Sequence, residues 1–377
     1  MKCPVFKVCG GCKYPHEDYK KSLEKKENWL KSLFPKEKIN PILGTKDPYF
    51  YRNKVHAALS YDRKNLVVGR YIEDSHRIIE TERCLIEDER AQAIIKTLKI
   101  LLKKYKWQIY DEDKRTGVLR RILIRTAHKT GEILVTLVVV RREVPGKNNF
   151  VKDLRKERPE ITSIVFNENN RDTSMILGTK ESVAFGKGFI KDELLGLKFR
   201  ISSQSFYQVN VPMTEILYKK AIEYLHPKKE GIYLDAYCGI GTISLYLAGF
   251  CKQVYGVEYN PQAVKDAIQN AKANGIKNAF FTASTTGDYL KELYGRKLTP
   301  DGIIIDPPRS GLEKETVDAL LKIKAPRIVY ISCHPEALKR DLEKLSKVYK
   351  LEELQPVDMF PFTSHVECIA LIQRAGL

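Results

Sequence analysis

The fold is decided by the stretch IYLDAYCGIGT at residues 232–242. It opens with a short apolar run that ends in an acid, Asp235, and two glycines follow at positions 239 and 241. An apolar helix is expected directly afterwards, over residues 243–248. Glycines between a strand and a helix let a ligand approach the backbone and face the helix N-terminus. The stretch therefore predicts a nucleotide-binding strand, loop and helix.

Strands and helices alternate on the carboxyl side of this stretch, and a last strand is expected over residues 367–372. Such alternation is typical of a doubly wound α/β sheet with mostly parallel strands. It predicts one domain over residues 201–377. The other expected strands are 254–258, 279–282, 302–305 and 327–332, and the expected helices are 261–274, 313–322 and 335–347.

The residues around the glycine loop indicate a nucleoside cofactor. Glu258 closes the next strand, where a nucleotide-binding fold places an acid that bonds the ribose hydroxyls. A dinucleotide-binding loop would continue to a third glycine, but Ser244 stands there and Asp235 precedes the loop. This pattern favours S-adenosylmethionine over NAD.

Three more segments carry reactive side chains, and two of them, at Asp306 and Cys333, are expected at the same sheet edge, because ligands bind at the carboxyl ends of parallel strands. Asp306 and two prolines follow the strand over 302–305. Cys333 precedes a helix, which predicts a stabilised thiolate. Glu367 begins the last strand. Each segment also has a simpler interpretation. The segment at Asp306 could be a rigid turn, Cys333 an inert buried cysteine, and Glu367 a cap at the protein surface.

Residues 1–200 have the pattern of a different module. Strand-like runs separated by turn residues dominate it, so we expect an α+β, mainly antiparallel domain. The expected helices are 16–34 and 86–105, and the expected strands are 55–59, 66–71, 118–125, 133–140 and 161–166.

The formal net charge of +18 is concentrated in the first half of the chain. Residues 1–200 carry 43 Lys and Arg against 27 Asp and Glu, whereas residues 201–377 carry 22 against 20. This excess suits a polyanion, and a solvated Lys-rich surface explains the charge equally well. No apolar run reaches the length of about 18 residues that a membrane span needs, and the N-terminus lacks an apolar signal region. We therefore expect a cytoplasmic protein that does not contact a membrane.

Together these segments resemble the RNA uridine-5-methyltransferase family, which makes 5-methyluridine in transfer and ribosomal RNA with S-adenosylmethionine. The resemblance covers nearly the whole chain. Besides the segments above, it includes Tyr51-Arg-Asn-Lys54, Asn167…Leu177-Gly178 and Phe206-Tyr-Gln-Val-Asn210. It implies a Rossmann-like class I methyltransferase domain over 201–377 and RNA binding by residues 1–200.

The resemblance also implies roles for single residues. The positions that match cofactor contacts in the family are Gln208, Tyr237, Glu258 and Asp306, the nucleophile matches Cys333, and the base matches Glu367. C5 of uracil is a poor nucleophile, so such an enzyme first adds a thiolate to C6, which gives C5 carbanion character. After methyl transfer, a base must remove the C5 proton before the thiolate leaves.

Cys3, Cys9, Cys12 and the distant Cys84 resemble the iron–sulfur site of one branch of the family. Four thiolates suit a [4Fe–4S] cluster held by the loop over residues 1–12 together with Cys84. Zinc is the alternative, although all-cysteine zinc sites usually consist of two close pairs. Several family members begin with a β-barrel RNA-binding domain. Because the cysteine loop begins at residue 3, we expect none here.

Several functions remain open from the sequence. Ribosomal RNA, in particular 23S rRNA, is the favoured target, and uridine 54 of transfer RNA is the alternative. A non-catalytic RNA-binding protein on the same scaffold is a further alternative. Cytosine-5 and amino-group methyltransferases fit poorly, because Arg309 and Ser310 follow the prolines where those enzymes carry a cysteine or an aromatic residue. No obligate protein partner is evident.

Overall fold

The computed structural model describes residues 2–16, 18–63, 65–172 and 175–376. The chain forms two compact units that interleave along the sequence. The first contains the segment before residue 18, residues 48–193 and residues 200–211, and the second contains residues 18–47, 194–199 and 212–377. A functional division near residue 200 stays a prediction. Within the described residues, no helix is long and apolar enough to cross a membrane.

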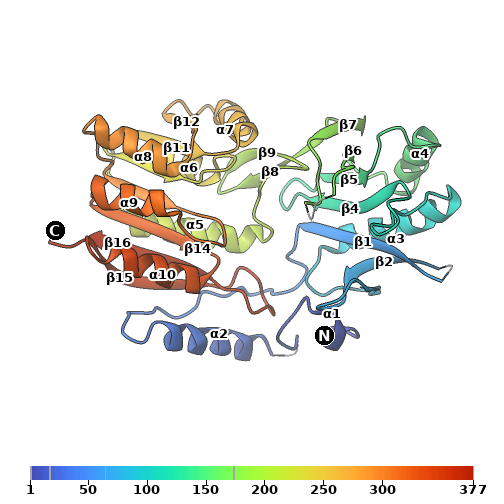
Figure 1. Ribbon diagram of the computed structural model, residues 1–377, viewed down its shortest axis with the longest axis horizontal. Coiled ribbons are helices and arrows are strands. Elements are labelled where there is room, and N and C mark those ends of the chain that lie inside the picture. The colour runs from blue at the N-terminus through green and yellow to red at the C-terminus, as the bar shows by residue number, and fades with distance from the viewer. Residues whose placement is uncertain (1, 17, 64, 173–174, 377) are drawn as a thin grey trace. The chain divides into compact units, whose positions relative to one another are not determined.

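The first unit is built on a seven-stranded sheet of order β3-β2-β1-β4-β5-β6-β7 (Figure 1). All neighbouring strands are antiparallel except β5 and β6. The strands are β1 Lys54–Asp62, β2 Asn65–Tyr71, β3 Ile78–Ile79, β4 Leu119–Thr126, β5 Ile133–Val139, β6 Ser163–Glu168 and β7 Lys180–Phe185.

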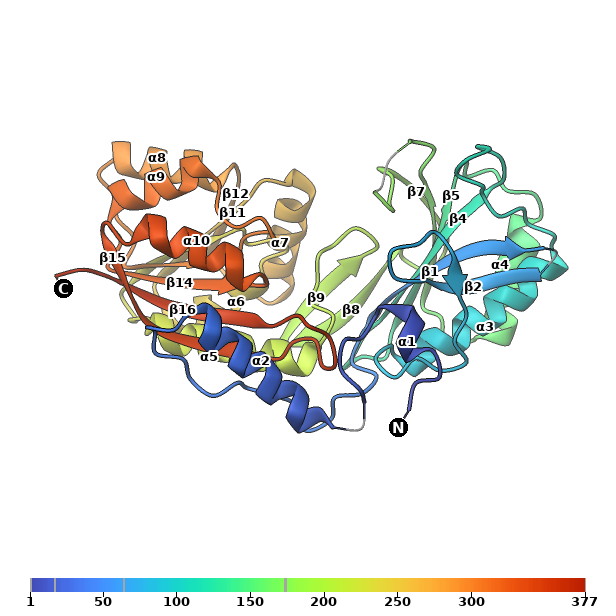
Figure 2. The same ribbon diagram turned by 60° about the horizontal axis from the view of Figure 1, so that its bottom comes forward.

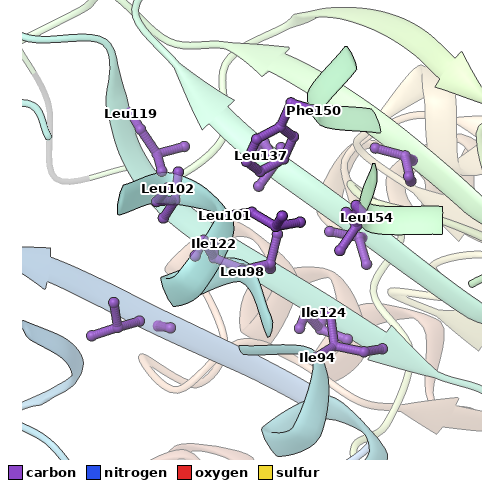
Figure 3. Close-up of a cluster of buried hydrophobic side chains, with 14 of the residues drawn as sticks. Ile94, Leu98, Leu101, Leu102, Leu119, Ile122, Ile124, Leu137, Phe150 and Leu154 are labelled. Atoms are coloured by element: carbon purple, nitrogen blue, oxygen red, sulfur yellow. The ribbon is translucent and has the colours of Figure 1, made fainter. Parts of the chain in front are cut away.

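Helices α3 (Glu89–Lys104) and α4 (Lys147–Glu157) cover one face of this sheet. Their apolar side chains pack on alternate strand residues, as Figure 3 shows for Leu98, Ile122 and Leu154. Trp107 stacks on Phe150 with ring centroids 4.2 Å apart. Strand side chains alternate between the two faces of a sheet, so the residues between these core positions point to the opposite face. A four-residue helix, α1 (Phe6–Cys9), lies in the cysteine loop.

The second unit contains a seven-stranded sheet of order β12-β11-β10-β13-β14-β16-β15. The strands from β12 to β14 are parallel, and β16 is antiparallel to both of its neighbours. The strands are β10 Ile232–Ala236, β11 Gln253–Glu258, β12 Ala279–Ala283, β13 Gly302–Ile305, β14 Arg327–Ser332, β15 Tyr349–Val357 and β16 Glu367–Arg374. Strands β8 (Phe189–Leu194) and β9 (Leu197–Ser202) form a separate two-stranded sheet.

Helices cover both faces of the second sheet, as the prediction of a doubly wound fold requires (Figure 2). One face packs against α8, α9 and α10, and α6 and α7 pack against β11 on the other. The helices are α5 Val211–Leu225, α6 Thr242–Leu247, α7 Pro261–Ala273, α8 Thr286–Gly295, α9 Lys314–Ile323 and α10 Pro335–Leu345, with a 3-10 turn at Ala248–Phe250.

Helix α2 (Tyr19–Leu33) belongs to the second unit although it lies near the N-terminus of the chain. Leu30 and Phe34 are buried in the core beside α10. Its Lys26 is 1% exposed and forms an ion pair with the fully buried Asp358, with Nζ 2.5 Å from Oδ1. The hydroxyl of Tyr19 donates to the other oxygen of Asp358 at 2.7 Å. The local pattern predicted the helix correctly but could not reveal this distant partner.

Candidate active site

The candidate site lies at the carboxyl edge of the parallel strands in the second unit. Strands β10, β13 and β14 end side by side, since Ala236 pairs with Ile305 and Ile305 pairs with Tyr330. Asp306 follows β13 directly, and Cys333 follows β14. The short buried strands therefore bring two side chains that are distant in the sequence to one edge of the sheet.

Glu367 reaches the same edge from the opposite direction. Strand β16 runs antiparallel to β14, and Cys368 pairs with Ser332. Cys333 follows Ser332, whereas Glu367 precedes Cys368, so the two reactive residues stand at the same end of adjacent strands. The alternation of elements predicted a strand here but not its direction.

The thiol of Cys333 is half-buried among charged groups. Its pKa is raised to about 11, first by burial and then by the carboxylates of Glu367 and Asp306, whereas Arg309 acts in the opposite direction. The expectation of a stabilised thiolate is therefore wrong for the protein without ligands. Desolvation and two neighbouring acids outweigh the start of α10, because a helix dipole contributes only about 0.3–1 kcal/mol at most surface sites.

The two carboxyl groups beside Cys333 are themselves hard to ionise. Burial raises the pKa of Glu367 to about 8, and the charge of Asp306 adds to this shift. Burial also raises the pKa of Asp306 to about 7. A carboxyl group with a pKa near neutrality can both take up and return a proton under physiological conditions, as a general base requires.

Asp235, at the end of β10, has one oxygen without a partner. Its side chain is completely buried, and Oδ2 accepts a hydrogen bond from the hydroxyl of Ser244. Oδ1 is buried with no hydrogen-bond partner, and burial raises the pKa of this carboxyl to about 7. A buried acceptor without a hydrogen-bond partner destabilises the folded state unless a ligand supplies a donor. The loop therefore fits a ligand that carries hydrogen-bond donors.

The glycine loop leaves room for such a ligand. Gly239 has a φ of 55°, and a Cβ atom there would meet nothing within 4 Å. Glu258, at the end of β11, orders the loop because its carboxylate accepts from the backbone N–H of Gly239 at 3.1 Å and from that of Asn260 at 2.8 Å. Each carboxylate oxygen has two lone pairs, so both retain capacity for a ribose hydroxyl.

Tyr237 occupies the first loop position in a left-handed conformation with a φ of 64°. Its hydroxyl donates to Glu313 Oε2 at 2.5 Å, and its ring packs against the core of the second unit. A left-handed conformation is rare for residues other than glycine, and such backbone conformations are concentrated at functional sites.

Gln208 lies in the first unit, within a segment that the motif Tyr51-Arg-Asn-Lys54 holds in place. The side-chain amide of Asn53 donates to the backbone carbonyl of Gln208 at 3.0 Å. The backbone N–H of Asn53 donates to the carbonyl of Val209, also at 3.0 Å. Asn53 is 7% exposed, so these bonds are shielded from water. One motif of the sequence thus positions another.

Tyr218 of α5 is a site residue that the sequence did not reveal. Its hydroxyl lies 3.1 Å from Oγ1 of Thr242, the first residue of α6. Burial raises its pKa, and the charges of Asp306, Asp235 and Glu367 act on it in the same direction. The phenol therefore stands among all three buried carboxyl groups. An aromatic residue in an apolar helix looks like a core residue, and no local signal distinguishes it.

The four predicted cluster cysteines all belong to the first unit. The pKa of Cys12 is raised to about 12, mainly by burial and also by the thiols of Cys84, Cys9 and Cys3, against the opposing charge of Arg70. Each of these three thiols therefore lies within electrostatic range of Cys12. The side chain of Gln92 fixes the segment at Cys84, since it accepts from the backbone N–H at 2.7 Å and donates to the carbonyl at 2.8 Å.

Across the part of the chain that the structure describes, no group of three or more His, Cys, Asp or Glu side chains could hold a metal ion. The described side chains thus form neither a ready zinc site nor a ready cluster site, and the metal assignment of the four thiols stays a prediction. The type and number of the donors, four cysteine thiols, match those of an iron–sulfur cluster, in which each iron is bound by a separate thiolate.

The order of the second sheet, its antiparallel β16 and the acid and glycine loop after β10 define the class of protein. This is the Rossmann-like fold of class I S-adenosylmethionine-dependent methyltransferases. The chain belongs to the tRNA (uracil-5-)-methyltransferase family, whose profile matches residues 18–375. It is therefore an enzyme of the RNA (uracil-5-)-methyltransferase type with an RNA substrate.

Similar proteins agree with this assignment. An RNA methyltransferase of Clostridium acetobutylicum is 40% identical over 99% of this chain and 83% of its own length. An RNA methyltransferase of Bacillus cereus is 38% identical with the same coverage of both chains. The crystal structure of Pyrococcus abyssi tRNA (uracil-54, C5)-methyltransferase with S-adenosyl-L-homocysteine has a TM-score of 0.77, 27% identity and coverage of 95% of this chain and 84% of that one.

Proposed function

We propose that the enzyme methylates C5 of a specific uridine in RNA through a covalent bond between Cys333 and C6 of the base. The observation that carries the proposal is the position of Cys333 and Glu367 at the same end of paired strands. The thiol first loses its proton, and the sulfur then adds to C6 while the electron pair of the C5–C6 double bond moves into an enolate. Arg309, which lowers the pKa of Cys333, favours the required thiolate.

Glu367 acts as the base in the second half of the reaction. Once C5 carries the methyl group, its carboxylate removes the C5 proton, the double bond forms again and the Cys333 sulfur leaves C6. The net change is the replacement of one uracil hydrogen by a methyl group. Because Glu367 is 3% exposed, water does not compete readily for its proton.

In this proposal, the cofactor is held by Glu258, Tyr237, Asp306 and Gln208. S-adenosylmethionine supplies the methyl group on its positively charged sulfur. The buried Oδ1 of Asp235, which has no partner, and the open space at Gly239 support a ligand at this loop. The carboxyl group of Asp306 can accept a hydrogen bond from the cofactor or the base.

The test removes the sulfur atom of Cys333. Cys333→Ala should abolish methylation of RNA and also the covalent adduct with RNA that contains 5-fluorouridine, in which fluorine blocks proton removal at C5. Cys251→Ala is the matched control, because Cys251 is also half-buried and precedes β11 at the other end of the sheet. Wild-type methylation by Cys333→Ala would remove the proposed nucleophile.

The target RNA has two candidates. Ribosomal RNA, in particular 23S rRNA, is the expectation from the sequence. Transfer RNA is supported by the similarity to the Pyrococcus abyssi enzyme, whose name specifies uridine 54. Mapping 5-methyluridine in RNA from a deletion strain decides between them: loss in 23S rRNA supports the first candidate, and loss at position 54 of transfer RNA supports the second.

We propose separately that Cys3, Cys9, Cys12 and Cys84 bind a [4Fe–4S] cluster. The support is the influence of the other three thiols on Cys12 and the nearby positive charge of Arg70, which acts on both Cys12 and Cys84 and suits an anionic cluster. Protein purified without oxygen should absorb at about 400 nm and contain iron and sulfide, and Cys84→Ser should lose both. A colourless protein with stoichiometric zinc would contradict this assignment.

A further inference from the structure

Helices α3 and α4 cover one face of the seven-stranded sheet in the first unit. Within the described part of the chain, the hydrophobic core of that unit contributes no helix to the other face. Val55 and Ala57 of β1 point into the core beneath α3 and α4. Lys54 and His56 alternate with them and therefore point to the opposite face. The register extends this face to β4, where Arg125 lies opposite Lys54.

Positive charge gathers on this face without a balancing acid. Like charges directly opposite each other destabilise a sheet, yet Lys54 pairs with Arg125, and Arg121 pairs with Ala58 two rows further on along the same face. Among the described residues, Lys54, Arg121 and Arg125 form no ion pair with any Asp or Glu. Arg125 is 3% exposed, and within the described ranges of the chain its guanidinium donates to the backbone carbonyls of Ser203 and Ser205.

Burial and the neighbouring positive charges shift the pKa values of two side chains on this face. Burial lowers the pKa of Lys54 to about 8, and the charge of Arg125 lowers it further. Burial lowers the pKa of His56 to about 3, and Lys54, Arg125, Arg52 and Arg121 add to the shift. His56 is thus neutral at pH 7, and its Nδ1 is buried without a hydrogen-bond partner. An anionic ligand that forms hydrogen bonds would lessen the repulsion among these groups.

An exposed aromatic side chain borders the same charges. The guanidinium of Arg121 lies 5.4 Å from the ring centroid of Tyr71 and donates to its hydroxyl at 2.5 Å. Tyr71 is 40% exposed. Unpaired RNA bases stack on aromatic rings and guanidinium planes, and each stacked base contributes about 1–3 kcal/mol.

We propose that this face, formed by Lys54, His56, Tyr71, Arg121 and Arg125, binds the phosphate backbone and an unpaired base of the substrate RNA. The inference rests on the proposed methylation of RNA and specifies where that substrate is held. Lys54 and Arg121 contact phosphate oxygens, Tyr71 stacks on a base, and Arg125 and His56 complete the positive, hydrogen-bonding floor of the face.

The test measures binding and not methylation, so it is independent of Cys333. Affinity for fluorescein-labelled oligouridine is followed by anisotropy at several salt concentrations. Lys54→Gln and Arg121→Gln should each weaken binding about three- to tenfold and reduce the slope of log affinity against log salt by about 0.7, since one phosphate contact is lost. Tyr71→Leu should weaken binding without changing the slope.

Lys103→Gln is the matched control, because Lys103 is an exposed lysine in the last turn of α3, on the covered side of the sheet. It should bind oligouridine as the wild type does. Affinity for S-adenosylhomocysteine and the thermal unfolding curve of each variant report whether it is folded. The proposal is overturned if folded Lys54→Gln and Arg121→Gln keep the wild-type slope, or if Lys103→Gln reduces it equally.

Discussion

The carboxyl group of Glu367 has an unusual environment for a residue that must carry charge. It is 3% exposed, and both burial and the nearby Asp306 favour its protonated form. Because the groups interact, the measured ionisation belongs to the pair and not to either residue alone. The same surroundings that make Glu367 an effective base also make its availability depend on pH.

We therefore predict that release of methylated RNA from Cys333 becomes faster as pH rises and levels off above about 8. A base with a raised pKa is mostly protonated below that value, so the rate should fall about tenfold for each pH unit below it. Single-turnover experiments with rapid quenching measure this step. Glu367→Gln should accumulate the methylated covalent adduct, and normal turnover by this variant would contradict the assigned role.

Tyr218 provides a second test at the level of single residues. Tyr218→Phe removes a hydroxyl dipole from the vicinity of three buried carboxyl groups, so the pH at which the rate levels off should move upward. A purely structural role would lower stability without moving the pH profile. Tyr246→Phe, on α6, is the control, because the ring of Tyr246 packs against Phe250 and not among these acids. An unchanged profile for Tyr218→Phe would contradict its role as a positioning residue.

At the scale of elements, the attachment of α2 depends on one buried ion pair. Lys26 donates to Asp358 and, at 3.1 Å, to the carbonyl of Phe360. Removing one member of such a pair leaves an uncompensated charge in the core. The helix also contributes Leu30 and Phe34 to the core of the second unit, so loosening it disturbs apolar packing as well.

We predict that Lys26→Met lowers the free energy of unfolding by about 3–5 kcal/mol. The double variant Lys26→Met with Asp358→Leu should recover much of this loss, because no buried charge remains. Urea unfolding followed by circular dichroism measures both. A change of less than about 1 kcal/mol for Lys26→Met would show that water reaches Asp358.

The elements also show how far the sequence could be interpreted. Strands β13 and β14 have the predicted bounds, because both are apolar runs between turn residues. Strand β15 was not predicted, since Lys350, Glu352 and Glu353 interrupt its apolar pattern. It is an edge strand, stabilised by pairing with β16.

The sequence indicated the candidate site only in part. The rule that ligands bind at the carboxyl ends of parallel strands predicted that Asp306 and Cys333 would lie at one edge. The approach of Glu367 depends on the direction of β16, which hydrophobic periodicity does not reveal. The pKa of Cys333 was predicted in the wrong direction, because burial and the neighbouring carboxylates depend on tertiary structure.

At the scale of the whole molecule, the order of segments along the chain differs from their assignment to compact units. Residues 18–47 complete the second unit, whereas residues 48–193 form most of the first. A fragment that begins at residue 194 would lack α2 and expose the core surface that Leu30 and Phe34 cover. Burial of a Leu or Phe side chain contributes about 1.5–3 kcal/mol, so this loss is a substantial fraction of a typical domain stability of about 5–15 kcal/mol.

We predict that a fragment of residues 194–377 does not unfold cooperatively, and that adding a peptide of residues 18–47 restores part of the cooperativity. Thermal unfolding followed by near-ultraviolet circular dichroism tests both statements. A peptide with Lys26→Met should restore less than the natural sequence. Cooperative unfolding of the fragment alone would mean that α2 is an accessory to the second unit.

The pairing of Lys26 with Asp358 has a consequence for biosynthesis. The two residues are separated by 332 positions, and a ribosome adds about 5–20 residues per second, so Asp358 is synthesised about 17–66 s after Lys26. During that interval the amphipathic segment has left the exit tunnel with its apolar stripe uncovered. Nascent chains should therefore be open to chaperone binding at this segment, and slower translation would prolong that exposure.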